Sequence, residues 1–129
     1  MRDYRGKHRK NAKWVYGKLF HFCDVSANIY SDNLDKPVWV DPETVGQCSG
    51  VPADDGTPIY EGDIVEAVLT DGNHSGFSWG RQVVVFDRGA FCLKNRRGEL
   101  TPMCNYAANV KFKVCGNIHD NPLPWEVSE

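Results

Sequence analysis

Glu61 and Asp63, two residues apart in a plausible turn of the 129-residue sequence, are the pair of carboxylates considered for acid–base chemistry. Acid–base hydrolysis needs two carboxyl groups in one cleft with pKa values that differ. Two residues apart on an extended chain, these side chains point to the same side. An Asp at the start of a strand, however, usually accepts hydrogen bonds from nearby backbone N–H groups. We therefore expect Asp63 to cap a strand and Glu61 to lie on a solvated edge, and a carboxylate hydrolase is the least supported function.

Nucleophilic and metal chemistry have no complete motif in the sequence. Residues 76–80 (Gly-Phe-Ser-Trp-Gly) resemble the nucleophile elbow of serine hydrolases only superficially, because no helix is predicted after them. The cysteine and histidine spacings match no zinc site, and no phosphate-binding loop or dinucleotide fingerprint is present. We expect no catalytic residue, no bound metal and no small-molecule cofactor.

The first 22 residues are strongly basic, with seven Lys or Arg against one acid. Cations that bind phosphates and flat rings that stack on bases are typical of nucleic-acid binding. Trp14 and Tyr16 follow the basic run, but their spacing of two in a strand is more typical of core residues. Nucleic-acid binding is therefore the alternative function, and its candidate residues are Arg2, Arg5, Lys7, Arg9, Lys10 and Lys13.

Charge alternates along the chain, although the net charge is only −2. The net charge is +6 over residues 1–22, −10 over 23–75, +5 over 76–119 and −3 over 120–129. Either these segments pair with one another in the fold, or the basic arm projects toward an anionic partner.

A Gly, Asn and Ser-rich segment over residues 71–80 carries the two aromatic residues Phe77 and Trp79. Large aromatic side chains are enriched at the centres of protein interfaces. The alternative is that both rings cap the end of a barrel. We predict that Phe77 and Trp79 bind a protein partner, and a protein-interaction module is the first candidate function.

Length and composition place the protein among small globular proteins. A chain of 14.5 kDa with 41% hydrophobic residues fills one core. The longest apolar stretch is five residues, and the N-terminus shows no export signal, so we expect a cytoplasmic protein without a membrane span. Its odd count of five cysteines then predicts free thiols.

Alternating apolar and polar residues dominate, and no segment shows a helical stripe over three turns. Over residues 13–22 the alternation places Trp14, Tyr16, Phe20 and Phe22 on one face of a strand, in which Gly17 suggests a bulge. The run 109–118 predicts a last strand with Val110, Phe112 and Val114 inward. The sequence predicts a mainly β protein with little helix.

Short strands and tight turns from residue 57 to 118 favour a small closed or nearly closed barrel, with a β-sandwich as the alternative. Asp87-Arg88-Gly89 predicts one of the tight hairpins. We expect one compact unit composed of an N-terminal β extension over residues 1–50 and a barrel with its C-terminal tail over residues 51–129.

Several segments, spread over nearly the whole chain, match one family pattern in its order. Together they resemble the phage YopX protein family. They are Tyr4-Arg5-Gly6-Lys7, Trp14-Val15-Tyr16-Gly17, Thr44-Val45-Gly46-Gln47, Gly50, Gly56, Ile59-Tyr60-Glu61-Gly62-Asp63-Ile64-Val65, Gly89-Ala90-Phe91, Gly116-Asn117-Ile118 and Asn121-Pro122.

The resemblance implies a β-rich protein encoded in phages and prophages, with an SH3-like barrel over its second half and no established biochemical activity. It also implies self-association. The sequence departs from the family pattern at Cys48-Ser49, at Arg9-Lys10 and at Leu123-Pro124-Trp125. An acid is common in the family at the second of these, so a basic arm that the family does not share would be a property of this protein and its own partner. We predict a non-enzymatic phage accessory protein that acts by binding, with a protein as the first partner and nucleic acid as the alternative.

Overall fold

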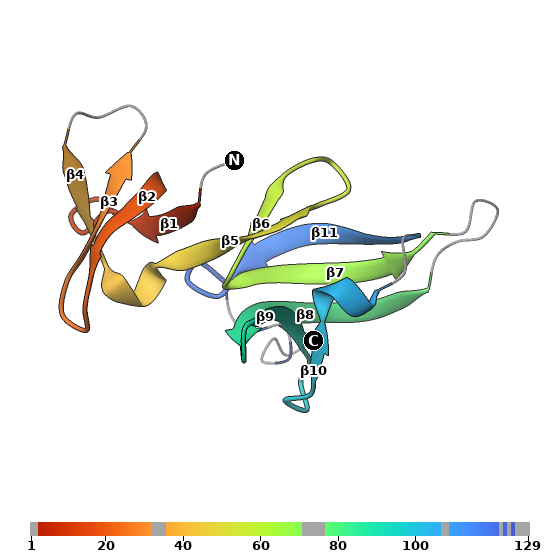
Figure 1. The fold of residues 1–129 in the computed structure, drawn as a ribbon. Coiled ribbons are helices and arrows are strands. Elements are labelled where there is room, and N and C mark those ends of the chain that lie inside the picture. The colour runs from red at the N-terminus through yellow and green to blue at the C-terminus, as the bar shows by residue number, and fades with distance from the viewer. Residues whose placement is uncertain are drawn as a thin grey trace. The chain divides into compact units, whose positions relative to one another are not determined.

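The computed structural model describes residues 3–31, 36–70, 77–106, 109–121, 123 and 125. Antiparallel strands and two short 3₁₀ turns make up its regular structure, so the mainly β prediction is confirmed (Figure 1). By its internal contacts the chain divides into two compact units, Met1–Cys48 and Ser49–Glu129. Each unit is described by itself.

The first unit is an antiparallel sheet with the strand order β4-β3-β2-β1, to which the first residues of β5 are added beside β1. The strands are β1 (Tyr4–Lys7), β2 (Trp14–Phe22), β3 (Ala27–Ser31), β4 (Pro37–Val40) and β5 (Gly46–Pro52). Between β4 and β5 lies the 3₁₀ turn η1 (Pro42–Thr44), capped by Asp41, whose Oδ1 accepts from the backbone N of Glu43 at 3.1 Å.

The core of the first unit differs from the predicted one. A register shift in the β2–β3 ladder between Leu19 and His21 breaks the alternation of β2. Phe20 has no partner in this ladder and Phe22 pairs with Ala27, so the prediction that all four aromatic residues share one face is wrong; both phenylalanines are exposed. The buried centre consists of Ala27, Ile29 and Val40, against which Tyr4, Val15, Leu19 and Val45 pack.

Gly17 permits a close approach of strands rather than a bulge. A Cβ atom at this position would collide with the backbone carbonyl oxygen of Tyr30 on β3. Only glycine therefore allows β2 and β3 to pair here.

The second unit contains the end of β5, the short strand β6 and a five-stranded antiparallel sheet with the order β10-β9-β8-β7-β11. In Figure 1, β11 runs beside β7 along its length. These strands are β6 (Pro58–Tyr60), β7 (Asp63–Leu69), β8 (Ser78–Asp87), β9 (Ala90–Lys94), β10 (Leu100–Pro102) and β11 (Val110–Asn117), with the turn η2 (Met103–Asn105) between the last two. Over the described residues no ladder joins β10 to β11, so the sheet is open and the predicted closed barrel is not seen.

The inward face of β11 follows the prediction only in part. Val110 and Phe112 are buried as expected, but Val114 is 37% exposed although it pairs in register with the buried Val65; the register shifts only after it, before Gly116. The buried core of this unit is formed by Ala53, Ile59, Val65, Ala67, Val84, Leu93, Met103, Val110 and Phe112.

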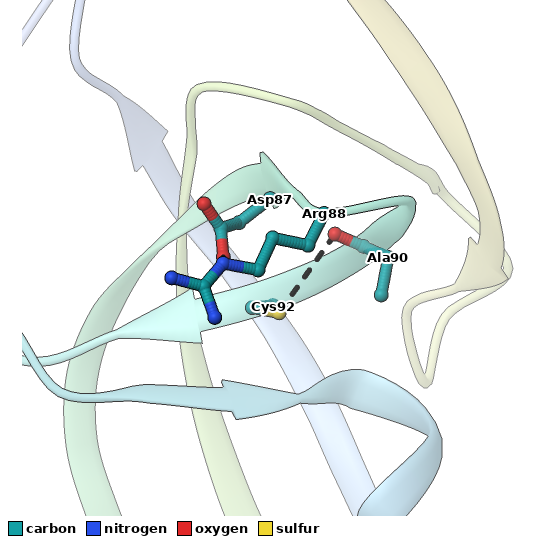
Figure 2. Close-up of polar contacts among 4 residues, drawn as sticks. All are labelled: Asp87, Arg88, Ala90 and Cys92. Carbon is teal, nitrogen blue, oxygen red and sulfur yellow. Dashed lines mark hydrogen bonds and ion pairs between the residues drawn. The ribbon is translucent and has the colours of Figure 1, made fainter.

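The predicted hairpin at Asp87-Arg88-Gly89 is confirmed (Figure 2). Arg88 and Gly89 have φ values of 50° and 84°, and positive φ at both central residues is the signature of a type I′ turn. The exposed Arg88 Nε lies 3.8 Å from Asp87 Oδ2. Cys92 Sγ donates to the carbonyl of Ala90 at 3.7 Å and is buried, and this burial raises the pKa of the Cys92 thiol. Cys92 is thus an inert core residue.

Candidate binding surfaces

The two carboxylates considered for acid–base chemistry, Glu61 and Asp63, differ in burial. Asp63 is 2% exposed, and its Oδ2 accepts from the backbone N of Tyr60 at 2.8 Å. Gly62, with a φ of 94°, makes the turn that brings these groups together. The predicted cap is confirmed, and a carboxylate held in this way does not face a cleft. Glu61 is only half-buried.

Ser78 lies at the start of β8, so a strand rather than a helix follows the Gly-x-Ser-x-Gly segment. Its Oγ donates to Glu66 Oε2 at 2.6 Å and accepts from the backbone N of Gly80 at 3.0 Å. A nucleophile elbow instead requires a strand-to-helix turn and a basic partner for the hydroxyl. Across the described ranges, no group of three or more His, Cys, Asp or Glu is arranged to hold a metal ion.

The two predicted aromatic residues lie together on the surface of the second unit. Phe77 is 61% and Trp79 42% exposed, and their ring centroids are 5.1 Å apart with the rings perpendicular. Trp79 contacts Tyr106 edge-on at 5.5 Å, and Tyr106 contacts the buried Phe112 at 5.5 Å. We call these four residues the aromatic row. It leads from solvent into the core, so its exposed end is held by packing rather than by the loop alone.

A small cavity of about 360 Å³ lies next to the aromatic row. Trp79 and Arg81 of β8 line it together with Asn95, Arg96 and Trp125. The ladder between β8 and β9 ends at Val83 and Lys94, so β8 extends beyond its neighbour at this end. Two arginines and an aromatic ring thus border a stretch of β8 that β9 does not cover.

The basic arm of the first unit is not uniformly exposed. Arg5 is 6% exposed, with Cζ 4.4 Å from the centroid of the Trp14 ring, and Lys7 places Nζ 5.6 Å from the same centroid. The β1–β2 register sets Arg5 opposite Tyr16 and Lys7 opposite Trp14, which places all four side chains on one face. The cations stabilise the tryptophan, and Arg5 is not available to a phosphate at the surface.

The other cations predicted to bind nucleic acid differ in what the structure shows of their exposure. Arg9, Lys10 and Lys13 are exposed in the turn between β1 and β2. Arg2 lies outside the described residues. The structure therefore retains three of the six candidates as exposed surface cations.

The turn between β1 and β2 is fixed against β4. The backbone N of Arg9 donates to the carbonyl of Trp39 at 3.0 Å, and the N of Asp41 donates to the carbonyl of Lys7 at 2.9 Å. His8 forms an antiparallel bridge with Val40. Lys10 N also donates to His8 Nδ1 at 3.1 Å. These bonds hold the basic turn beside the outer strand of the sheet.

A groove of about 900 Å³ lies between this turn and β4, and we call it the β4 groove. The side chain of Trp39, 51% exposed, offers the flat surface in it. None of the described residues that line it is acidic. Its polar and charged lining consists of His8, Arg9, Lys10, Ser26 and Lys36.

The geometry of both units can now be compared with known proteins. The family model described as YopX protein matches residues 3–123, which is nearly the whole chain. The chain belongs to the YopX family. The resemblance seen in the sequence is thereby confirmed, and no curated protein matches the chain. The match spans both units of this YopX chain, so the aromatic row and the β4 groove both lie within the family region.

One chemically distinctive residue of the YopX chain has no counterpart in the sequence predictions. Cys23 follows β2, and its Sγ lies 3.4 Å from Ser26 Oγ. Hydrogen bonds from the Ser26 side chain, from the backbone of Val25 and Ser26 and from His21 lower the pKa of the Cys23 thiol to about 7. The sequence feature that could have indicated a reactive cysteine is His21, which lies two residues before Cys23. At neutral pH a large fraction of the Cys23 thiol is therefore in the reactive thiolate form.

Within the described part of this YopX chain, no helix has the length and hydropathy needed to cross a membrane.

Proposed function

We propose that this YopX family protein is a non-enzymatic, phage- or prophage-encoded accessory protein of the bacterial cytoplasm that binds a protein partner. The observation that carries the proposal is the pair of exposed rings, Phe77 and Trp79, held edge-on by Tyr106. Aromatic residues fixed before binding lose little conformational entropy on association, which makes them effective anchors. The proposal includes an SH3-like barrel for residues 57–118, supported by the family resemblance and the order of short antiparallel strands.

The lining of the cavity beside the aromatic row indicates the chemistry of the partner. Arg81 and Arg96 border it, and they favour carboxylates on the bound segment. The stretch of β8 beyond β9 offers main-chain groups to an extended chain, as in binding by strand addition. We therefore commit to an extended acidic segment of another protein that carries an apolar side chain for Phe77 and Trp79.

Selection of a displayed peptide library on the immobilised full-length protein tests this proposal. We expect enriched peptides to combine Asp or Glu with large apolar residues. The variant with Phe77→Ala and Trp79→Ala should bind them at least roughly tenfold more weakly, since hot-spot rings each contribute about 2 kcal/mol or more. Phe20→Ala with Phe22→Ala is the matched control, because these rings are exposed on the first unit and outside the aromatic row.

Three outcomes would contradict the proposal. They are enrichment of basic peptides, enrichment of no peptides, and equal binding by the aromatic variant and the control. Light scattering of the purified protein tests whether the partner is instead a second copy of this chain. If the protein forms a dimer that the aromatic variant abolishes, Phe77 and Trp79 serve self-association and not the binding of another protein.

Nucleic-acid binding is the second candidate function. The observation that favours it is the placement of Arg9 and Lys10 in the β4 groove beside the exposed ring of Trp39. It uses a different surface from the aromatic row, so the two functions are tested independently. An electrophoretic shift at low salt is the first test, and no retention of either DNA or RNA would end this candidate.

A further inference from the structure

We propose that the β4 groove binds one nucleotide unit of a single-stranded nucleic acid, with its base stacked on Trp39 and its flanking phosphates bound by Arg9, Lys10 and Lys36. The inference rests on the second candidate function and deepens it by naming the ligand, the contacts and the ring. Notably, the ring is Trp39 rather than Trp14 or Tyr16, the aromatic residues that follow the basic arm in the sequence.

The groove is a built feature rather than a chance gap between flexible side chains. The backbone N of Arg9 donates to the carbonyl of Trp39 at 3.0 Å, so the main-chain positions that carry the cation and the ring keep a fixed relation. The His8–Val40 bridge closes the same end of the turn. Sites whose positions are set by backbone hydrogen bonds lose little entropy when a ligand binds.

The charge of the lining is complementary to a phosphate backbone. Arg9, Lys10 and Lys36 are exposed and basic, and the described lining contains no acid to compete for them. His8 adds a donor, because its Nδ1 accepts from Lys10 N and the neutral ring then carries its proton on Nε2. Lys13, exposed at the end of the same turn, extends the basic surface beyond the groove.

The apolar part of the lining is complementary to a base. Trp39 exposes 51% of its surface although it belongs to a strand, and Pro37 and Val38 of the same strand complete the apolar wall. Stacking on an aromatic ring is the contact common to all bases, and it requires a base that is not already stacked in a duplex. A single strand fits this requirement, and a double helix does not.

A polymer fits better than a free nucleotide because the cations are spread along the groove. Arg9 and Lys10 belong to the turn after β1, whereas Lys36 precedes β4. One base on Trp39 leaves the phosphates of the strand on both sides of it for these three cations. Three phosphate contacts predict a slope of about −2 for the logarithm of the association constant against the logarithm of salt concentration.

Fluorescence anisotropy with the full-length protein tests the inference. The probes are labelled single-stranded dT12 and rA12, a labelled 12-base-pair duplex, and unlabelled AMP as competitor. We expect the single strands to bind, the duplex to bind at least tenfold more weakly and AMP to compete only at far higher concentration. Trp39→Ala should weaken binding of the strands roughly 5- to 150-fold, the range that corresponds to the loss of one stacked base, and Trp39→Phe should restore most of it.

The charge contribution is tested with matched variants. Arg9→Ala with Lys10→Ala should weaken binding and make the salt slope about 1.4 units less negative. Lys111→Ala with Lys113→Ala removes the same charge from exposed positions of β11 in the second unit and should leave binding and slope unchanged. Phe86→Ala is the control for loss of an exposed aromatic ring. Far-UV circular dichroism of each variant verifies the fold.

The outcomes separate the inference from the second candidate function. No binding of any probe overturns both. If Arg9→Ala with Lys10→Ala weakens binding but Trp39→Ala does not, nucleic-acid binding survives and the stacking inference fails. Preference for the duplex, or competition by AMP at concentrations similar to that of the strands, overturns the inference in the same way. If Lys111→Ala with Lys113→Ala weakens binding as much as Arg9→Ala with Lys10→Ala, binding follows the overall charge and the groove is not the site.

Discussion

Replacing Tyr106 by Leu should loosen Trp79 without changing the exposed surface of the aromatic row. Tyr106 contacts Trp79 on one side and the buried Phe112 on the other, both edge-on with centroids 5.5 Å apart. Each such contact contributes about 0.5–1.5 kcal/mol beyond its buried area. Leucine keeps much of that area but has no ring, so Tyr106→Leu should lower the free energy of unfolding of the second unit by about 1–3 kcal/mol.

A double-mutant cycle isolates the contact between Trp79 and Tyr106 from the general cost of each substitution. The four proteins are the wild type, Trp79→Ala, Tyr106→Leu and the double variant. We expect a coupling energy of about 0.5–1.5 kcal/mol, with the lower half of that range favoured because Trp79 is partly exposed. Urea unfolding followed by circular dichroism gives the free energies.

The control cycle pairs Trp79→Ala with Phe86→Ala. Phe86 lies seven residues further along β8, at roughly 23 Å in an extended strand, so the two effects should add within about 0.5 kcal/mol. The reasoning is refuted if the Trp79–Tyr106 pair is also additive within about 0.3 kcal/mol. In that case the rings are neighbours without mutual stabilisation, and the exposed pair is not held in place before binding.

Three further predictions concern the turns and strands that position the surfaces. Alkylation of Cys23 by iodoacetamide, followed by peptide mass spectrometry, should rise with pH with a midpoint near 7, and Ser26→Ala should move that midpoint toward 9; an unchanged midpoint would show that the hydrogen bond does not lower the pKa. Gly17→Ala should destabilise the first unit by about 1–3 kcal/mol or more in urea unfolding, because its Cβ would collide with the carbonyl oxygen of Tyr30, and a loss well below that range would contradict the close approach. Arg88→Asn should stabilise the second unit by roughly 1 kcal/mol, because Asn tolerates the positive φ better and the exposed ion pair lost with Arg88 contributes little; thermal unfolding without a gain would contradict the turn assignment.

Structural features that depend on a few consecutive residues were predicted correctly. The hairpin at Arg88 and Gly89 and the cap by Asp63 each depend on the backbone preference of a few consecutive residues. Alternation within one strand also predicted the burial of Phe112. These features are local, so their physical cause is contained in the segment that shows them.

Prediction failed where one added residue changed a ladder. At the register shift after Leu19, Phe20 is the residue of β2 without a partner in β3, and it is exposed, because one added residue breaks the alternation. Val114 precedes the shift in β11, so that shift does not account for its exposure. Gly17 suggested a bulge in the first of these strands, but the shift lies after Leu19. A bulge is decided by the partner strand as much as by the strand that contains it.

For the basic residues, too, the sequence determined some properties and the tertiary structure determined others. Their types and order, and the exposed pair Phe77 and Trp79, could be read from the chain and suggested binding rather than catalysis. Which of the cations face solvent was decided only by folding, since Arg5 stacks on Trp14 while Arg9 reaches the strand that carries Trp39. The physical reason is that composition and alternation act within a segment, whereas a groove forms from backbone hydrogen bonds between strands that are distant in the sequence.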